Sequence, residues 1–309
     1  MRIAVVGVGG TGGYFGGLLA RAGEDVTFIA RGTTLAALRA NGLTVESRVE
    51  GTFTVPVQAT DDPMTVGPVD LVLFCVKSYD TTTAAGQIRP LVGPETVILS
   101  VQNGVDNEER IAEVVGPAPV IGGVAGVSAH SAAPGVIVLD QEPGFLRFGE
   151  LAGGTSPRTE RLLEVFERAP FTATLLPDIR VQMWEKFVFI CALSGVTSLV
   201  RLPVGPILRY PETTQLYRGV MEEVAAVARA RGVDLPDERV DEWFRASGEI
   251  SPMVYGSMYH DLAAGRRLEV EALNGTVVRF GQEHDIPTPL NFAIYAALKP
   301  YADGTPAMP

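Results

Sequence analysis

The first 31 residues constrain the fold of this chain most strongly. Arg2–Val6 (RIAVV) is a nearly all-apolar run, typical of a strand buried on both faces of a parallel sheet. A glycine-rich turn, a helical pattern through Tyr14–Leu19 and a second strand pattern at 25–30 (DVTFIA) follow. The turn has G-x-G-x-x-G spacing, with its glycines at Gly7, Gly9 and Gly12. Between a strand and a helix, this spacing predicts a dinucleotide-binding unit.

Each residue of the turn has an expected task. The first glycine permits a tight turn, the second lets backbone approach a pyrophosphate, and the third lets helix pack on strand. The N–H groups and positive dipole at the helix start favour phosphates. We therefore expect the cofactor to be bound by Gly7, Gly9, Gly10, Thr11 and Gly12. The alternative is a glycine-rich turn in an α/β fold that binds no ligand.

The end of the second strand indicates which dinucleotide is bound. NAD sites usually place an acid there, about 20 residues after the glycines. This chain has Ala30-Arg31-Gly32-Thr33 instead, whereas Glu24 and Asp25 come before the strand. A guanidinium suits a ribose 2′-phosphate. Arg31 therefore favours NADP, although a solvated surface arginine is the common alternative.

Composition narrows the class of protein. A chain of 309 residues is long enough for two domains with substantial cores. Its formal charge of −11 argues against nucleic acid or an anionic membrane as a partner. Cys75 and Cys191 lie in apolar runs, as thiols do in a reducing compartment, and we see no signal peptide or confident membrane span. We expect a soluble, cytoplasmic protein that acts on a small molecule.

Further strand patterns place polar residues where a ligand would bind. Strands are expected at 69–76, 96–101, 120–128, 134–139, 144–149 and 171–176, with a hairpin formed by 43–46 and 52–57 around Glu50-Gly51. Lys77 follows the strand at 69–76, and Asn103 follows the strand at 96–101. Ligands of open α/β sheets bind outside these strand ends. Asn103 is suited to a nicotinamide ribose or a substrate oxygen, although an Asn-Gly turn without a ligand is equally common.

The pattern of apolar residues changes near Pro177-Asp178, from one typical of strands to one typical of helices. We therefore predict an α/β, Rossmann-type dinucleotide-binding domain at 1–178 and an all-helical substrate domain at 179–309. Helices are expected at 179–200, 216–231, 237–247, 253–264, 269–284 and 290–298. The apolar helices of the second domain make a homodimer plausible.

Three polar features stand out in the helical half. Lysine occurs only three times, at Lys77, Lys186 and Lys299, and Lys186 lies about two turns into the long apolar helix. A buried lysine can protonate a developing alkoxide, whereas a lysine that snorkels or pairs with a carboxylate is the common alternative. Ser257 and Glu269 lie in polar stretches, GSMY and RRLEVEALNG. The histidines and cysteines lack metal-ligand spacing, so no metal is expected.

Taken together, these motifs resemble the ketopantoate reductase (2-dehydropantoate 2-reductase) family. The matching stretches are GVGGTGG, ARG, CVKSYD, QNGV, WEK, GSM and LEVEALNG, in family order over both halves. The resemblance implies NADPH-dependent reduction of a 2-oxo acid, ketopantoate to pantoate in pantothenate biosynthesis, with the active site in the cleft between the domains.

The resemblance also implies roles for individual residues. Lys186 corresponds to the catalytic lysine and Glu269 to the active-site glutamate, while Ser257 corresponds to a serine that binds the substrate carboxylate. Asn103 corresponds to an asparagine beside nicotinamide and substrate. Lys77 corresponds to a lysine near the cofactor, and Arg31 to an arginine that binds the 2′-phosphate.

The chain departs from the family at two substrate-contacting positions. Family members typically carry asparagines four and eight residues after the catalytic lysine, where this chain has Ile190 and Ser194. Loss of a neutral hydrogen bond costs about 0.5–1.5 kcal/mol, which favours a more apolar substrate. The alternatives are therefore a family member that reduces another ketone or an imine, an NADPH-binding redox sensor, and a structural protein with a vacant site.

Overall fold

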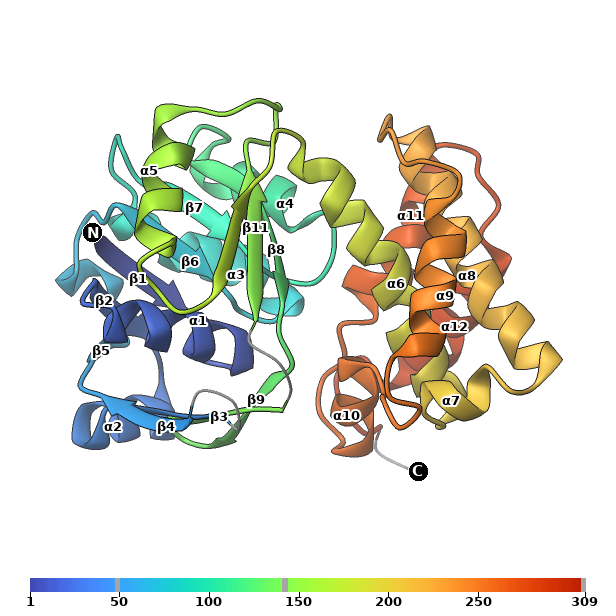
Figure 1. Cartoon of the computed structure of the whole chain (residues 1–309), viewed down its shortest axis with the longest axis horizontal. Helices are drawn as coiled ribbons and strands as arrows, with labels where there is room; N and C mark the ends of the chain where they lie inside the picture. Colours follow the sequence, from blue (N-terminus) through green and yellow to red (C-terminus); the bar gives the residue numbers. More distant parts are fainter. Residues whose placement is uncertain (48–50, 141–143, 307–309) are drawn as a thin grey trace. The chain divides into compact units, whose positions relative to one another are not determined.

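The structure is a computed structural model that describes residues 1–47, 51–140 and 144–306. It divides into two compact units (Figure 1). The first comprises Met1–Gln102 and Asn107–Ile179, and the second comprises Arg180–Pro309 together with the short segment Asn103–Asp106.

The first unit is built on one large sheet. Within the described residues, eight strands form it in the order β12-β11-β8-β7-β6-β1-β2-β5. The strands are β1 (Arg2–Val6), β2 (Asp25–Ile29), β5 (Gln58–Thr60), β6 (Leu71–Phe74), β7 (Val97–Ser100), β8 (Val120–Gly126), β11 (Phe145–Gly149) and β12 (Thr172–Leu175). The strands from β5 to β8 pair in parallel, and β11 pairs antiparallel with β8. The predicted Rossmann-type fold is thereby confirmed.

Strand β1 is the point at which the strand order reverses. It pairs with β2 on one side and with β6 on the other, both in parallel. In open α/β sheets, a crevice for ligands forms at the carboxyl ends of strands at such a reversal. The glycine turn after β1 and Lys77 after β6 therefore begin at the same edge of the sheet.

A second, smaller sheet covers the first helix, α1 (Gly10–Arg21). Its strands run in the order β4-β3-β10-β9. The bounds are β3 (Leu43–Ser47), β4 (Gly51–Val55), β9 (Ala129–Ala133) and β10 (Val136–Leu139). The predicted β3–β4 hairpin is confirmed, but Glu50 of its turn lies outside the described residues. The strands expected at 134–139 and 144–149 are both present, and each pairs antiparallel with one neighbour, but they belong to different sheets. Strand β10 pairs in parallel with β3 and antiparallel with β9, a strand the sequence did not indicate.

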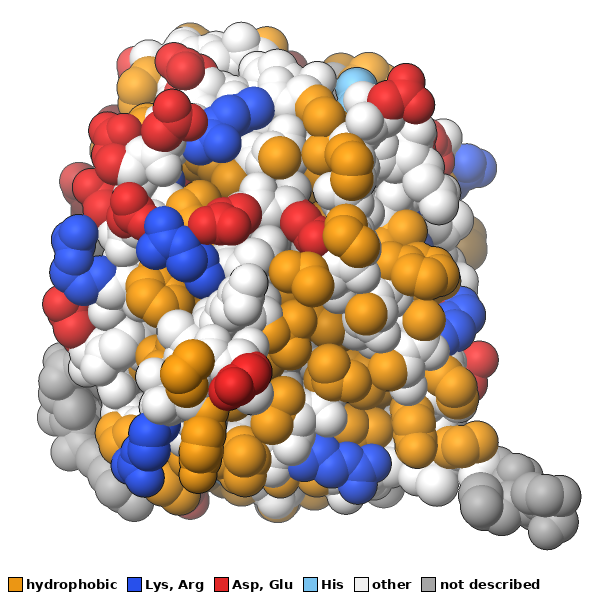
Figure 2. Space-filling model, turned by 90° about the vertical axis from the view of Figure 1, so that its right-hand side faces the viewer, with side chains coloured by type: hydrophobic (Ala, Val, Ile, Leu, Met, Phe, Trp, Pro, Cys, Tyr) orange, Lys and Arg blue, Asp and Glu red, His pale blue; other side chains and the backbone are white. Residues whose placement is uncertain are grey.

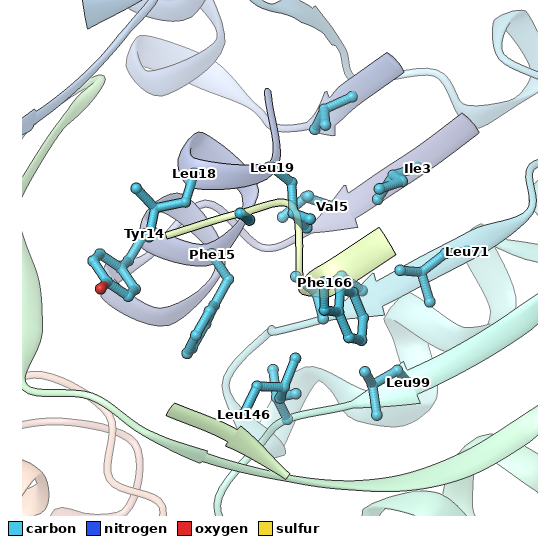
Figure 3. Packing of buried hydrophobic residues seen from close by; sticks show 14 of the residues in the cluster. Ile3, Val5, Tyr14, Phe15, Leu18, Leu19, Leu71, Leu99, Leu146 and Phe166 are labelled. Atoms are coloured by element: carbon cyan, nitrogen blue, oxygen red, sulfur yellow. The ribbon is translucent and has the colours of Figure 1, made fainter. Parts of the chain in front are cut away.

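The core of the first unit packs α1 between the two sheets. Tyr14, Phe15, Leu18 and Leu19 are fully buried in one cluster with residues of the large sheet, and Figure 3 shows Leu19 beside Val5 of β1. The remaining helices of this unit are α2 (Gly32–Asn41), α3 (Thr81–Gln87), α4 (Asn107–Val115) and α5 (Pro157–Phe166). A second cluster of buried residues, from Ala4 to Val120, packs on the α3 and α4 side of the sheet. The sheet is therefore buried on both faces, as its continuous apolar strands predict.

The second unit is helical. Its helices are α6 (Ile179–Val200), α7 (Val204–Ile207), α8 (Pro211–Ala230), α9 (Arg239–Glu249), α10 (Ser257–Ala263), α11 (Thr276–Glu283) and α12 (Pro289–Leu298). Two predicted helices differ from those observed. The predicted helix at 253–264 begins only at Ser257, with Gly256 as its N-cap. The predicted helix at 269–284 starts with a π turn, Glu271–Gly275, before α11.

Helix α6 is the apolar spine of this unit. By length and composition it is the one helix among the described residues that could cross a membrane, but 72% of its most apolar window is buried inside the protein. That burial is typical of a core helix. Hydrophobic side chains also gather on one face of the second unit (Figure 2), and Tyr210, Met253 and Phe292 are more than half exposed. The homodimer stays a prediction.

Candidate active site

The glycine turn has the geometry that close approach of a ligand requires. Gly7 has a φ of +97°, and a Cβ there would lie 2.8 Å from the Cys75 carbonyl. A Cβ at Gly12 would lie 2.1 Å from the Gly7 carbonyl oxygen, so this glycine lets α1 pack on β1. At Gly9, by contrast, nothing lies within 4 Å of a Cβ position. The space beside Gly9 is open.

The start of α1 leaves its backbone donors available to an anion. Gly9 is the N-cap and offers no side-chain cap, and no acidic residue lies in the first turn. A Cβ at Gly10 would lie 2.0 Å from the Ala129 carbonyl oxygen of β9, so protein already fills that side of the turn. A helix start of this kind attracts phosphate groups.

Arg31 lies two residues after the end of β2, at the N-cap of α2. Its side chain is exposed. Among the described residues, its guanidinium has no hydrogen-bond or ion-pair partner. No acidic residue occurs between Ile29 and Asn41 to hold ribose hydroxyls. Arg31 therefore offers positive charge at the strand end where the adenosine ribose lies in folds of this type.

Lys77 and Asn103 follow adjacent parallel strands, β6 and β7. Lys77 is partly buried and caps the short helical turn Ser78–Asp80 in an extended backbone conformation. The Gln102 side chain donates to the Val76 carbonyl at 2.8 Å, which ties the two strand ends together. Asn103 is partly buried and begins the segment that groups with the second unit.

The three side chains of the WEK motif on α6, Trp184 to Lys186, have different surroundings. Trp184 is buried and packs edge-on against Phe187 at 5.5 Å between ring centroids. Glu185 pairs with Arg239 of α9 at 2.7 Å. Lys186, which directly follows these two anchored residues on the chain, is partly buried. The packing of Trp184 and the ion pair of Glu185 fix the rotation of α6 and hence the place of the lysine.

Burial and one carboxylate together set the pKa of Lys186. Desolvation lowers the pKa of Lys186 from an ordinary 10.5 to about 8, and the nearby negative charge of Glu269 opposes that decrease. Glu269 is itself only 5% exposed. A lysine with a pKa near 8 is still largely protonated at neutral pH, yet it releases a proton far more readily than an ordinary lysine. The two residues that the resemblance pairs thus interact within one unit.

Ile190 and Ser194 continue the face of α6 that carries Lys186, because residues four apart lie on the same side of a helix. Ile190 is partly exposed, whereas Ser194 is only 4% exposed. A Cβ at Gly256 would lie 2.4 Å from the Ser194 Cα, and the Gly256 N–H donates to Thr197 Oγ1 at 3.1 Å. The start of α10 is therefore anchored on α6, which places the exposed Ser257 next to this face.

Sequence reasoning missed the polar residues that support this arrangement. Asn274 and Asn291 are fully buried in the second unit, and Asn274 lies against Gly195 of α6. Gly195 was the signal in the sequence, because a glycine inside an otherwise apolar helix costs about 1 kcal/mol relative to alanine and therefore indicates close packing by another residue. Among the described residues, no group of three or more His, Cys, Asp or Glu side chains is arranged to hold a metal ion.

Comparison with known proteins gives the family. Residues 3–153 match the family described as ketopantoate reductase PanE/ApbA, and residues 178–302 match its C-terminal domain. A 2-dehydropantoate 2-reductase from Caulobacter vibrioides is 30% identical over 296 residues, covering 96% of this chain and 97% of the relative.

Solved structures agree. A PanE/ApbA family ketopantoate reductase from Ralstonia eutropha JMP134 has a TM-score of 0.90 at 35% identity, covering 98% of both chains. A ternary structure of D-mandelate dehydrogenase with NADH and anilino(oxo)acetate has a TM-score of 0.89 at 20% identity, covering 98% of both chains, and at that identity it shows the fold alone. With two family domains matched in order and a relative 30% identical along nearly its whole length, this chain belongs to the ketopantoate reductase family of oxidoreductases.

Proposed function

We propose that this protein is an NADPH-dependent reductase of a 2-oxo acid, ketopantoate or a related substrate, with Lys186 as the proton donor. The observation that carries the proposal is the electrostatic pairing of a partly buried Lys186 with a buried Glu269. Desolvated lysines with tuned pKa values are typical of acid–base sites.

The first unit has the features that NADPH requires. Open space beside Gly9, the uncapped start of α1 and the positive φ of Gly7 suit a pyrophosphate. Exposed Arg31 suits the 2′-phosphate, and the lack of an acid after β2 disfavours NAD. Lys77 and Asn103 follow β6 and β7 at the edge where the nicotinamide end would lie. When bound, NADPH supplies the hydride for the carbonyl carbon.

The second unit supplies the proton. In its ammonium form, Lys186 polarises the substrate carbonyl and transfers a proton from Nζ to the oxygen as alkoxide character develops. Glu269 keeps the lysine protonated and orients it. Ser257, at the first position of α10, binds the substrate carboxylate, and Asn103 holds a substrate or ribose oxygen. This division of roles follows the resemblance stated above.

The face of α6 bears on substrate choice. Ile190 presents an aliphatic side chain one turn after Lys186 and cannot form a hydrogen bond with its side chain. A substrate whose carbon skeleton packs against Ile190 is therefore favoured over one that needs a hydrogen bond there. The fold does not decide the question, since D-mandelate dehydrogenase has the same fold.

A different ketone or an imine is the alternative for the same site, and Ile190 is the observation that favours it. A redox sensor without turnover is disfavoured, because a sensor has no use for a proton donor held by a buried carboxylate. The proposal includes a cytoplasmic location and, with ketopantoate as the substrate, a place in pantothenate biosynthesis.

The experiment is an NADPH oxidation assay with ketopantoate beside a panel of bulkier 2-oxo acids, ketones and imines. Turnover of ketopantoate or of another 2-oxo acid supports the proposal. Turnover restricted to simple ketones or imines would replace the substrate class while keeping the chemistry. Tight NADPH binding without oxidation across the panel would contradict enzymatic function and favour a sensor.

A further inference from the structure

The π turn that follows Glu269 is fastened on two sides. On its outer side, Glu271 pairs with Lys299, and Tyr295 of α12 donates to the same carboxylate at 3.1 Å. Within the turn, the Gly275 N–H donates to the Val270 carbonyl at 2.9 Å, a bond that skips one residue more than in an α-helix. Turns of this type are rare in proteins, and those that occur often lie at functional sites.

On its inner side, the π turn is held by a chain of buried amides. Asn274 Nδ2 donates to Asn291 Oδ1 of α12 at 2.9 Å and to the Cys191 carbonyl of α6 at 3.4 Å. Asn291 Nδ2 in turn donates to Glu223 of α8 at 2.8 Å. The same carboxylate accepts the N–H groups of Leu290 and Asn291 at 2.8 and 2.9 Å, which caps the start of α12. One polar chain thus connects α8, α12, the π turn and α6.

Two hydrogen bonds fix the orientation of the Asn274 amide, and its buried oxygen costs free energy because no described residue donates to it. Its Nδ2 faces two acceptors, which fixes the orientation of the amide, while its Oδ1 is buried with no hydrogen-bond partner among the described residues. A buried unsatisfied acceptor costs about 1–3 kcal/mol. An apolar side chain would remove this unsatisfied acceptor but would also leave the buried Asn291 Oδ1 without its donor, so the value of Asn274 lies in the direction of its two hydrogen bonds.

Gly195 makes this contact possible. A Cβ at this position would lie 2.8 Å from Asn274 Oδ1 and 2.9 Å from Nδ2, so the amide occupies the space that any other residue would fill. Glycine inside a helix costs about 1 kcal/mol relative to alanine. The close packing of Asn274 on α6 accounts for its presence in the middle of α6.

Resting on the proposed function, we propose that Asn274 is a positioning residue, which locks the π turn onto α6 and thereby holds Glu269 against Lys186. Glu269 ends the segment that enters the π turn, and its carbonyl accepts the Leu273 N–H at 3.0 Å. Asn274 contacts the same helix that carries Lys186, at the Cys191 carbonyl and at Gly195. The amide therefore sets the spacing between the two elements that bear the charged pair.

The other charged groups on these elements are engaged elsewhere. Glu185, next to Lys186 on α6, pairs with Arg239, and Glu271 of the π turn pairs with Lys299. Arg279 of α11 pairs with Asp106 at 2.8 Å and with Glu283 at 3.3 Å. Glu269 is the group whose charge acts on Lys186. Displacing the π turn should therefore change the titration of Lys186 through Glu269.

The test uses the small number of lysines in the chain, which are Lys77, Lys186 and Lys299. Brief acylation of the full-length protein with acetic anhydride across a pH series, followed by mass spectrometry, gives a titration midpoint for each lysine without need of turnover. Two variants loosen the contact from opposite sides: Asn274→Leu removes the amide, and Gly195→Ala pushes against it. Gly248→Ala in α9 is the matched control, because nothing lies within 4 Å of its Cβ position.

We expect the Lys186 midpoint to fall by about one pH unit in Asn274→Leu and in Gly195→Ala, since loss of a nearby opposite charge disfavours the ammonium. The Gly248→Ala protein should match wild type. In the NADPH assay, kcat should fall and its alkaline limb should move down with the midpoint, with no change in the KM for NADPH.

An unchanged Lys186 midpoint in a folded variant would overturn the inference, as would an equal shift in Gly248→Ala. If Asn274→Leu does not fold, Gly195→Ala decides alone. Failure of every carbonyl in the turnover panel would instead contradict the proposed function, and the acylation midpoints would still test the role of Asn274.

Discussion

The negative charge of Glu269 opposes the decrease in the pKa of Lys186 that burial causes. Burial lowers the pKa of the lysine to about 8, and the carboxylate of Glu269 holds it from falling further. Both residues belong to the second unit, on elements joined by the buried amide of Asn274.

The pH dependence of kcat should report Lys186. The ammonium form donates the proton, so kcat should fall as pH rises through about 8. In Glu269→Gln the ammonium loses its favourable partner, and the alkaline limb should move to lower pH. A profile of kcat under saturating substrate and NADPH measures both. A limb that stays in place in Glu269→Gln would contradict the pairing.

Folding stability should carry the opposite signature. The pKa of Lys186 is lower in the folded protein than the ordinary 10.5, so the unfolded chain binds more protons between pH 8 and 10.5, and stability should rise with pH over that window. Below pH 8 the free-energy penalty for burying the Lys186 ammonium is fully present. At 1.36 kcal/mol per pKa unit it is at most about 3 kcal/mol, and less where solvent reaches the ammonium.

Lys186→Met should therefore unfold at a higher urea concentration than wild type at pH 7, and the difference should shrink toward pH 10.5. The surface change Lys299→Met is the control and should alter stability little, by about 0.5 kcal/mol or less. Equal urea midpoints for Lys186→Met and wild type at pH 7 would mean that the lysine is well solvated.

Arg31→Ala should weaken NADPH binding by roughly ten- to a hundredfold, because charge-assisted hydrogen bonds contribute about 1.5–3 kcal/mol. NADH lacks the 2′-phosphate, so its affinity should not change. Quenching of intrinsic fluorescence measures both dissociation constants. Arg39→Ala, on the exposed side of the same helix, is the matched control. Equal losses for both cofactors in Arg31→Ala would remove the 2′-phosphate role.

Ile190→Asn should shift substrate preference. A new amide one turn from Lys186 can bind a substrate hydroxyl, and one such hydrogen bond is worth about 0.5–1.5 kcal/mol, or roughly two- to tenfold in kcat/KM. The ratio of kcat/KM for ketopantoate to that for an apolar 2-oxo acid should rise by this factor. Ile190→Leu keeps the site apolar and should leave the ratio unchanged. A ratio unaffected in Ile190→Asn would place the residue outside the substrate site.

Much of the fold could be predicted from local pattern. The strands of the large sheet are short apolar runs, and the turn after Val6 has glycines where backbone packs against backbone. The small sheet could not be predicted as one unit, because β10 pairs with β3 about 90 residues away in sequence, and β9 is an exposed run of small and polar residues. Pairing over such distances leaves no local signal.

The candidate site divides in the same way. Lys186 stands out because lysine is rare in this chain, and the resemblance assigns Glu269 beside it. The buried chain from Glu223 to Asn274 depends on four elements meeting in space, which periodicity along one helix cannot reveal. The π turn was predicted as ordinary helix, because its residues have the same apolar spacing as the helix that follows.

The central claim is that Lys186 donates the proton, and the most direct measurement is the turnover of Lys186→Ala with the best 2-oxo acid, alongside its dissociation constant for NADPH. General acid catalysis contributes about 10²–10⁴-fold, so kcat should fall by that factor while NADPH affinity stays at the wild-type value. Gly248→Ala in α9, where nothing lies within 4 Å of the Cβ position, should keep full activity. Near-wild-type kcat in Lys186→Ala would contradict the account, and the proton donor would then have to be sought elsewhere in the protein.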